Sequence, residues 1–208
     1  MKRIVEIDSW KRKAQFNFFK DFGNPFFSLV SNVECTASVS YCKENEISFF
    51  LWYLYLSMKA VNEIEEFKYR YDGSEVVVFD KVNATPTIAR ADETFGFSYI
   101  EYLDDFEEYN RLAIIEIERV KNEVGLKPAT NNENVIHCSS IPWLSFTGIS
   151  HPLSMKEYDS CPKISFGKTF EQDGKIMMPV SVHANHALMD GLHVSRFFEK
   201  FEFYLKNP

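Results

Sequence analysis

The stretch KISFGKTFEQDGKIMMPVSVHA, residues 163–184, carries the clearest strand pattern in the chain. Apolar side chains alternate with polar or small ones before the Asp173–Gly174 pair, and the alternation resumes after it. An Asp-Gly pair between two alternating runs predicts a β-hairpin with one face in the core. The apolar positions are Ile164, Phe166, Phe170, Ile176, Met178, Val180 and Val182.

Helical patterns lie outward from this hairpin in both directions. Residues 191–205 repeat apolar side chains at helical spacing and predict a final helix. We also expect an aromatic-rich helix over 45–62 and an amphipathic helix over 104–123. A short helix over 8–20 is expected to begin at Asp8 or Ser9. The stripe of the 104–123 helix consists of Phe106, Tyr109, Leu112, Ala113 and Val120.

Further strands are predicted between these helices. Residues 26–35 form one apolar run, and residues 67–80 place two β-type runs around a second Asp-Gly turn. Residues 85–90, 93–100 and 135–146 also read as extended. This mixture predicts an α/β (α+β) protein, a two-layer sandwich in which helices cover one face of a mixed β-sheet.

Composition limits the class of protein. The chain has 208 residues, of which 45% are hydrophobic and 20 are phenylalanine, as expected for one domain spanning residues 1–208. The net charge is −7. An acidic surface argues against a nucleic-acid binder, which needs a basic face.

No targeting or membrane segment is predicted. The N-terminus lacks the apolar core of a signal peptide, and the apolar stretch at 47–61 is too short to span a bilayer. The four cysteines form no C-x-x-C pair, so we expect buried thiols in a cytoplasmic protein. His183 and His186 are three residues apart on a strand, which places them on opposite faces, so no metal site is expected.

The segment HANHALMDGLHV, residues 183–194, holds the candidate chemistry. His186 lies where the last predicted strand meets the last helix, and histidine is the usual general base near neutral pH. Asp190 could instead cap the helix and leave His186 as an ordinary loop histidine. On these residues alone the structural interpretation is favoured, because short motifs produce many false matches. A Ser-His-Asp hydrolase is poorly supported because no G-x-S-x-G elbow is present.

The segment nevertheless resembles a known signature. HALMDG, residues 186–191, matches H-x-x-x-D-G of the CoA-dependent acyltransferases, and LHVSRF resembles the continuation in the chloramphenicol acetyltransferases. Four further stretches resemble that family in chain order, so the resemblance covers nearly the whole sequence. They are SWKRKAQF (9–16), EFKYRYDGSEVVVFDKV with DETFGF (66–97), SSIPWLSF (139–146) and DGKIMMPVSV (173–182).

The resemblance implies an O-acetyltransferase that uses acetyl-CoA and acts on chloramphenicol, hence an antibiotic-resistance enzyme without a metal. His186 matches the general base, which takes the proton from the acceptor hydroxyl while that hydroxyl attacks the thioester. Its other ring nitrogen is expected to bond to its own backbone carbonyl. Asp190 matches an aspartate that pairs with an arginine of the first helix, here Arg12.

The same resemblance implies roles for residues from other segments. Ser139 matches a serine that stabilises the tetrahedral oxyanion. Ser165 falls where the family has a threonine that holds a water molecule. Trp143 matches a tryptophan beside the CoA tunnel, with a core tryptophan as the alternative. Phe18, Phe27 and Phe95 match aromatic positions of the acceptor pocket, although core packing is the preferred interpretation of each of them taken alone.

Two departures leave the acceptor open. Asn185 stands where the family usually has a histidine, and His151 stands where it has a leucine in the acceptor pocket. The alternatives are therefore the same chemistry on another hydroxyl or amine, or a non-catalytic trimeric binding protein. The family is a homotrimer with active sites between subunits, so the same assembly is expected here, without nucleic-acid or membrane partners.

Overall fold

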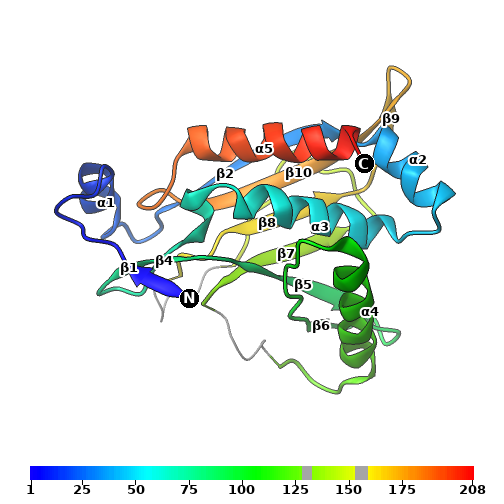
Figure 1. Cartoon of the computed structure of the whole chain (residues 1–208), viewed down its shortest axis with the longest axis horizontal. Helices are drawn as coiled ribbons and strands as arrows, with labels where there is room; N and C mark the ends of the chain where they lie inside the picture. Colours follow the sequence, from blue (N-terminus) through cyan, green and yellow to red (C-terminus); the bar gives the residue numbers. More distant parts are fainter. Residues whose placement is uncertain (128–132, 153–158) are drawn as a thin grey trace.

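The alternating run at 163–184 forms the centre of a seven-stranded mixed sheet in the computed structural model, which describes residues 1–127, 133–152 and 159–208 (Figure 1). The strand order is β2-β10-β8-β7-β5-β6, and β9 also pairs with β10. Strands β5, β7 and β8 are parallel to one another, and the other pairings are antiparallel. The bounds are β2 Phe26–Glu34, β5 Asn83–Ala89, β6 Phe95–Phe97, β7 Val135–Ile141, β8 Lys163–Gly167, β9 Phe170–Gln172 and β10 Lys175–Asn185.

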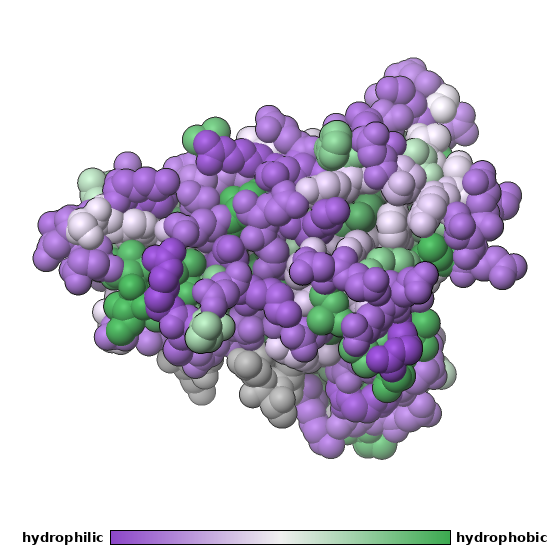
Figure 2. Space-filling model, viewed as in Figure 1, coloured by the Kyte–Doolittle hydropathy of each residue, from purple (hydrophilic) through white to green (hydrophobic). Residues whose placement is uncertain are grey.

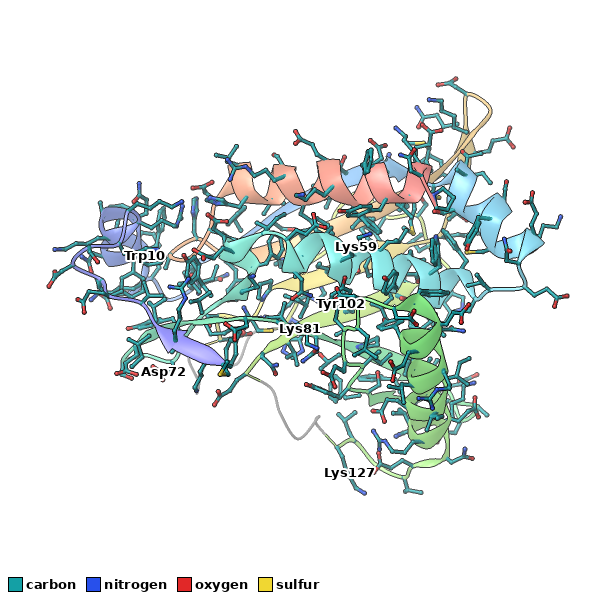
Figure 3. All side chains as sticks on the ribbon, viewed as in Figure 1. Trp10, Lys59, Asp72, Lys81, Tyr102 and Lys127 are labelled. Carbon is teal, nitrogen blue, oxygen red and sulfur yellow. The ribbon has the colours of Figure 1, made fainter. Side chains whose placement is uncertain are left out.

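A second sheet of three strands lies at the N-terminal end of the molecule, in the order β1-β4-β3. Strands β3 (Tyr69–Tyr71) and β4 (Val76–Phe79) form the predicted hairpin around the second Asp-Gly pair. Strand β1 (Lys2–Ile4) pairs with β4 and forms the other edge of this sheet. Trp10 packs edge-on against Tyr69 with 5.1 Å between ring centroids, which joins the segment before α1 to this sheet (Figure 3).

Helices cover one face of the large sheet. Helices α3 (Phe49–Asn62) and α5 (Gly191–Lys206) run across the sheet, and α2 (Thr36–Glu44) lies at its end near the C-terminus (Figure 1). Helix α4 (Phe106–Asn122) packs beside β5 and β6, and α1 (Lys13–Phe19) lies apart at the opposite end. The short 3-10 helix η1, Glu65–Lys68, joins α3 to β3. The predicted two-layer sandwich with a mixed sheet is confirmed.

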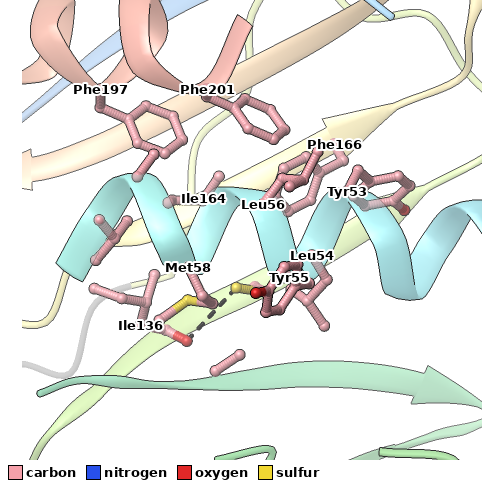
Figure 4. Packing of buried hydrophobic residues seen from close by; sticks show 14 of the residues in the cluster. Tyr53, Leu54, Tyr55, Leu56, Met58, Ile136, Ile164, Phe166, Phe197 and Phe201 are labelled. Carbon is pink, nitrogen blue, oxygen red and sulfur yellow. Dashed lines mark hydrogen bonds between the residues drawn. The ribbon is translucent and has the colours of Figure 1, made fainter. Parts of the chain in front are cut away.

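The main core lies between the sheet and the helices. Phe197 and Phe201 of α5 are fully buried and point toward α3 and β8 (Figure 4). They meet Ile164 and Phe166, which come from the helix-facing side of β8. Burying side chains of this size contributes about 1.5–3 kcal/mol each, and the final helix is therefore held to the sheet by its apolar stripe.

Strand alternation places polar residues on the sheet face opposite the helices. Ser139, Ser165 and Ser181 are aligned across β7, β8 and β10, because the register pairs Ser139 with Ser165 and Ser165 with Ser181. His137, Lys163 and His183 form the next aligned row. The alternating residues between these rows belong to the hydrophobic core. Because side chains alternate between the two faces of a strand, the register of β7, β8 and β10 places hydroxyl, imidazole and ammonium groups on one face of the sheet.

Several element boundaries differ from the predictions. Helix α1 begins at Lys13 rather than near Asp8, because the Asp8 carboxylate bonds to the Lys13 ammonium at 2.8 Å instead of capping the helix. Helix α3 begins at Phe49, where Ser48 accepts a hydrogen bond from the Leu51 N–H, and not at residue 45. The extended segment predicted at 135–146 ends as a strand at Ile141.

Helix α2 was not predicted, and one predicted core residue is on the surface. Helix α2 has few buried side chains, and tertiary contacts hold it: Ser38 donates to the Leu205 carbonyl at 2.7 Å and accepts from the Trp52 indole at 3.1 Å. Leu112 of α4 is 40% exposed, although it was assigned to the buried stripe. Asp105 caps α4, which begins one residue later.

On the face shown in Figure 2, hydrophilic residues predominate, with hydrophobic groups near the α1 end and over α4. Among the described residues, no helix combines the length and the apolar character needed to cross a membrane.

Candidate active site

His186 follows the last residue of β10 and occupies the loop before α5. Its backbone N–H donates to the Pro25 carbonyl at 2.8 Å, which holds the loop against the segment preceding β2. The imidazole stacks on Phe19 of α1, with centroids 4.2 Å apart and rings within 6° of parallel. Phe27 contacts the imidazole from another side at 4.7 Å. The half-buried ring is therefore held between two aromatic side chains.

The predicted bond from the His186 ring to its own carbonyl is not recorded. Nδ1 of His186 is buried and has no hydrogen-bond partner in the part of the chain that the structure describes. The His186 carbonyl instead accepts from Nη2 of Arg12 at 3.4 Å. Aromatic packing on Phe19 and Phe27, rather than this bond, orients the imidazole.

Arg12 and Asp190 tie the loop to the N-terminal segment. Nη1 of Arg12 lies 2.7 Å from Oδ2 of Asp190, and the Arg12 side chain is only 7% exposed. Burial disfavours the charged carboxylate, but the Arg12 hydrogen bond, the nearby positive charge and the Leu192 N–H together outweigh it and hold the pKa of Asp190 below its ordinary value. Asp190 also caps α5, because its Oδ1 accepts from the Leu192 N–H at 3.1 Å. The two functions expected for Asp190, helix cap and partner of Arg12, are therefore both present.

Asn185 stabilises the loop from its other end. Its side-chain oxygen accepts from the Ala187 N–H at 3.0 Å, and its carbonyl accepts from both Leu188 and Met189. A histidine at this position would not offer the same amide oxygen. Asparagine at this position, where the family usually has histidine, thus supplies a side-chain oxygen to the backbone of the loop.

Ser165 and His151 are in contact on the sheet face opposite the helices. Nε2 of His151 lies 3.1 Å from the Ser165 hydroxyl, and the His151 ring is edge-on to His183 at 4.8 Å. Burial, together with His183 and Lys163, lowers the pKa of His151 to about 4. Burial and Lys163 also lower the pKa of His183. Both imidazoles are therefore neutral near pH 7, and the charged group beside them, the Lys163 ammonium, is paired with Asp159 at 2.6 Å.

Ser139 is the neighbour of Ser165 across the β7–β8 pairing. It lines a cavity of about 790 Å³ together with Trp143, Phe95 and Thr87, and residues of α3 and α4 complete the walls. Most of the wall is apolar, and Trp143 is 75% exposed, which contradicts the alternative of a core tryptophan. His186 is not among the described residues that line this cavity. One chain therefore does not bring the predicted base and the predicted oxyanion donor into one cavity.

The three predicted acceptor-pocket phenylalanines have different environments. Phe27 contacts His186, as described above. Phe18 is 65% exposed at the α1 end, where its ring meets Phe19 and Phe22, and Phe95 is 46% exposed at the cavity. Core packing therefore explains neither Phe18 nor Phe95. These side chains are available to a ligand or to another chain.

Sequence reasoning missed Phe19, His193 and Glu66 near the loop. Phe19 carried no motif and was one of many phenylalanines. His193 occupies the third position of α5, where its ring accepts from the Asp190 N–H at 3.1 Å and completes a capping box. Glutamate or glutamine at this position is the usual signal, so a histidine was not recognised.

Metal and disulfide chemistry have no visible framework here. Within residues 1–127, 133–152 and 159–208, no group of three or more histidine, cysteine or acidic side chains is arranged to hold a metal ion. All four cysteines are free and buried, as expected for small hydrophobic side chains.

The geometry can now be compared with known proteins. The family model described as chloramphenicol acetyltransferase matches residues 2–202. A chloramphenicol acetyltransferase of Clostridium perfringens is 30% identical over 95% of this chain and 91% of its own length. The one from Proteus mirabilis is 27% identical over 97% and 93%.

A solved structure of a chloramphenicol acetyltransferase superposes with a TM-score of 0.89 at 31% identity, covering 99% of this chain and 100% of the other. A truncated catalytic core of a 2-oxoacid dehydrogenase complex from Thermoplasma acidophilum shares the fold, with a TM-score of 0.71 at 16% identity over 99% of each chain. The family match over nearly the whole sequence agrees with the histidine loop and the Arg12–Asp190 pair, and the protein belongs to the chloramphenicol acetyltransferase family.

Proposed function

We propose that the protein transfers the acetyl group of acetyl-CoA to a hydroxyl of chloramphenicol, with His186 as general base, and thereby confers resistance to the drug. The observation that supports this most is the His186 imidazole held between Phe19 and Phe27 on a loop pinned by Arg12. A hydroxyl is a weak nucleophile at neutral pH, and a placed neutral imidazole removes its proton as the new ester bond forms.

The remaining steps use residues of the cavity wall. Attack on the thioester carbonyl gives a tetrahedral oxyanion, which Ser139 stabilises by donating its hydroxyl hydrogen. Collapse of that intermediate breaks the carbon–sulfur bond and leaves the acetylated drug, and the departing CoA thiolate takes the proton that His186 had accepted. Trp143 and the apolar wall of the Ser139 cavity provide a surface for the pantetheine or adenine of CoA.

We infer that the working unit is a homotrimer with active sites between subunits. Ser139 lines a cavity without His186, so one chain supplies each half of the site at a separate place. A neighbouring copy that presents its His186 to the Ser139 cavity completes the site. Exposed Phe18, Phe22 and Leu29 near the His186 loop provide apolar area for such a contact.

Thiol release tests the reaction. Purified protein is mixed with acetyl-CoA and chloramphenicol, and free CoA is followed with a thiol reagent. We expect turnover by the wild type and near-complete loss for His186→Ala with the circular dichroism spectrum unchanged. Wild-type rates in His186→Ala would remove His186 as the base.

Mixing two inactive variants tests the site between subunits. His186→Ala and Ser139→Ala are unfolded, combined in equal amounts and refolded together. Random assortment gives about one quarter of all sites an intact His186 from one chain and an intact Ser139 from the next, so activity returns to roughly that fraction. If both residues act within one chain, no mixture regains activity above the separate variants.

The polar side chains of His151, Ser165 and His183 support an alternative acceptor substrate. The His151–Ser165 contact and the neighbouring His183 place neutral hydrogen-bonding groups on the sheet face that carries Ser139. An acceptor with more polar substituents than chloramphenicol would use them. A panel of hydroxyl and amine acceptors decides, because turnover of chloramphenicol at low KM would exclude this alternative.

One outcome would indicate simple binding instead of the reaction. Calorimetric binding of acetyl-CoA without thiol release for any acceptor would indicate a non-catalytic trimeric binding protein.

We also propose that residues 1–208 form one domain and that the enzyme works in the cytoplasm. Acetyl-CoA is available there, and the four free cysteines stay reduced.

A further inference from the structure

A line of contacts extends from the His186 loop through the start of α5 to η1. The His186 carbonyl accepts from Arg12, and Arg12 pairs with Asp190. The Asp190 N–H donates to the His193 ring, and the Asp190 carboxylate caps the first turn of α5. Nε2 of His193 then lies 3.2 Å from Oε1 of Glu66. These residues come from three separate segments of the chain, so the loop is held from outside as well as by its own turns.

The contacts of His193 define which ring nitrogen carries the proton. Nδ1 accepts the Asp190 N–H at 3.1 Å and is therefore unprotonated in this arrangement. Nε2 carries the hydrogen and donates it to Glu66. A carboxylate on one side and a backbone donor on the other hold the ring in one tautomer and one orientation.

The side chains of His193 and Glu66 are both buried, so water cannot replace the hydrogen bond between them. The exposed fractions are 7% for His193 and 8% for Glu66. The hydrogen bond from His193, acting against burial, lowers the pKa of Glu66 to about 2. The other charged group near this carboxylate is Lys11, whose ammonium is 3.8 Å away on a largely exposed side chain. Glu66 is thus ionised at neutral pH, and His193 is its buried partner.

We propose that His193, oriented by Glu66, is a positioning residue that sets the place of the His186 imidazole through Asp190 and Arg12. The inference rests on the proposed function, because it assigns these residues to the same reaction. Both side chains are buried and neither lines the Ser139 cavity, so we assign them to holding the loop rather than to contact with substrate. Their loss lowers kcat and leaves KM unchanged, because a base displaced by about 1 Å costs on the order of 10²-fold in rate.

The kinetic experiment compares four variants with the wild type. We expect His193→Leu to lower kcat by about 10²-fold with KM constant. His193→Gln restores most of this loss, because its amide can accept from Asp190 and donate to Glu66. Glu66→Gln lowers kcat about tenfold. Glu65→Gln is the matched control: it removes the same charge from the same turn, where Glu65 contacts Arg3 and Tyr69 and not His193.

Stability is measured beside the rates. A residue that only supports the fold lowers the denaturation midpoint and the folded fraction, but leaves kcat per folded site unchanged. Wild-type kcat in both His193→Leu and Glu66→Gln, with an active wild type, would overturn the positioning role and leave the acetyltransferase proposal intact.

A second readout does not depend on turnover. The five histidines are labelled with ¹³C, and the His186 signal is assigned with the His186→Ala variant. We expect the His186 signal to shift or broaden in His193→Leu and Glu66→Gln, and to stay in place in Glu65→Gln. An unmoved His186 signal in the first two variants refutes the inference, even if the wild type releases no thiol and the proposed reaction fails.

Discussion

The Arg12–Asp190 pair is expected to stabilise the fold asymmetrically, because its partners differ in exposure. The Arg12 side chain is 7% exposed and that of Asp190 is 35% exposed. Removing one partner of a buried pair costs about 3–5 kcal/mol, mainly because the other charge is left buried and alone. Removing Asp190 strands the more deeply buried charge, so that variant is the more harmful one.

The magnitudes follow from these exposures. Asp190→Asn keeps a good helix cap and loses the ion pair, and partial screening of the pair by solvent reduces its cost to about 2–3 kcal/mol. Asp190→Ala also loses the cap and costs about 1 kcal/mol more. Arg12→Met leaves a carboxylate that water can still reach, so we expect about 1–2 kcal/mol.

Urea denaturation of the wild type, the three single variants and the double variant Arg12→Met/Asp190→Asn tests this order at one fixed protomer concentration. Each kcal/mol corresponds to roughly 2–4 °C in Tm for a chain of this size. The double variant should cost clearly less than the sum of the single ones. A larger loss for Arg12→Met than for Asp190→Asn, or additivity within about 0.5 kcal/mol, would refute the reasoning from burial.

Three further results are expected. Ser139→Ala lowers kcat in the thiol-release assay by about 10²–10³-fold, because one oxyanion donor is lost; an unchanged kcat would exclude that role. The pKa of Glu66 lies near 2 rather than 4.5, so the stability it adds is full above pH 4.5 and is lost as the pH falls toward 2. Denaturation between pH 5 and pH 2 should thus show about 3 kcal/mol more loss for the wild type than for Glu66→Gln, and parallel curves would contradict this. Phe197→Ala, at a fully buried position, costs about 3–5 kcal/mol of unfolding free energy, whereas Phe203→Ala, at a 61% exposed position, stays within about 0.5 kcal/mol.

Local patterns were sufficient for most of the secondary structure. The hairpin of β9 and β10, the hairpin of β3 and β4, and helices α4 and α5 follow directly from period-2 and helical spacing with their turn and cap residues. Helix α2 was missed because its sequence has no apolar stripe, and its stability comes from Ser38 bonding to α3 and α5. The start of α1 was misplaced because Asp8 had a lysine partner that competed with capping.

Some residues of the candidate site were likewise predictable from the sequence, and others were not. The spacing of His186, Asp190 and Gly191 and the resemblance to a family identified the loop and its chemistry. Phe19, His193 and Glu66 carried no motif, because their contribution depends on where distant segments meet. The contact between the His186 ring and Phe19 joins a loop after β10 to a short helix near the N-terminus.

By itself, the sequence determined most of the strands and helices, the hydrophobic face of most of them, and the residue types available for acyl transfer, since these depend on neighbours a few positions away. The tertiary structure decided which of these residues meet. Arg12 reaches Asp190 across 178 positions of chain, and the Ser139 cavity forms away from His186. Such contacts depend on how the sheet register and the helix packing bring segments together, and that information is shared by the whole chain rather than written in any one stretch.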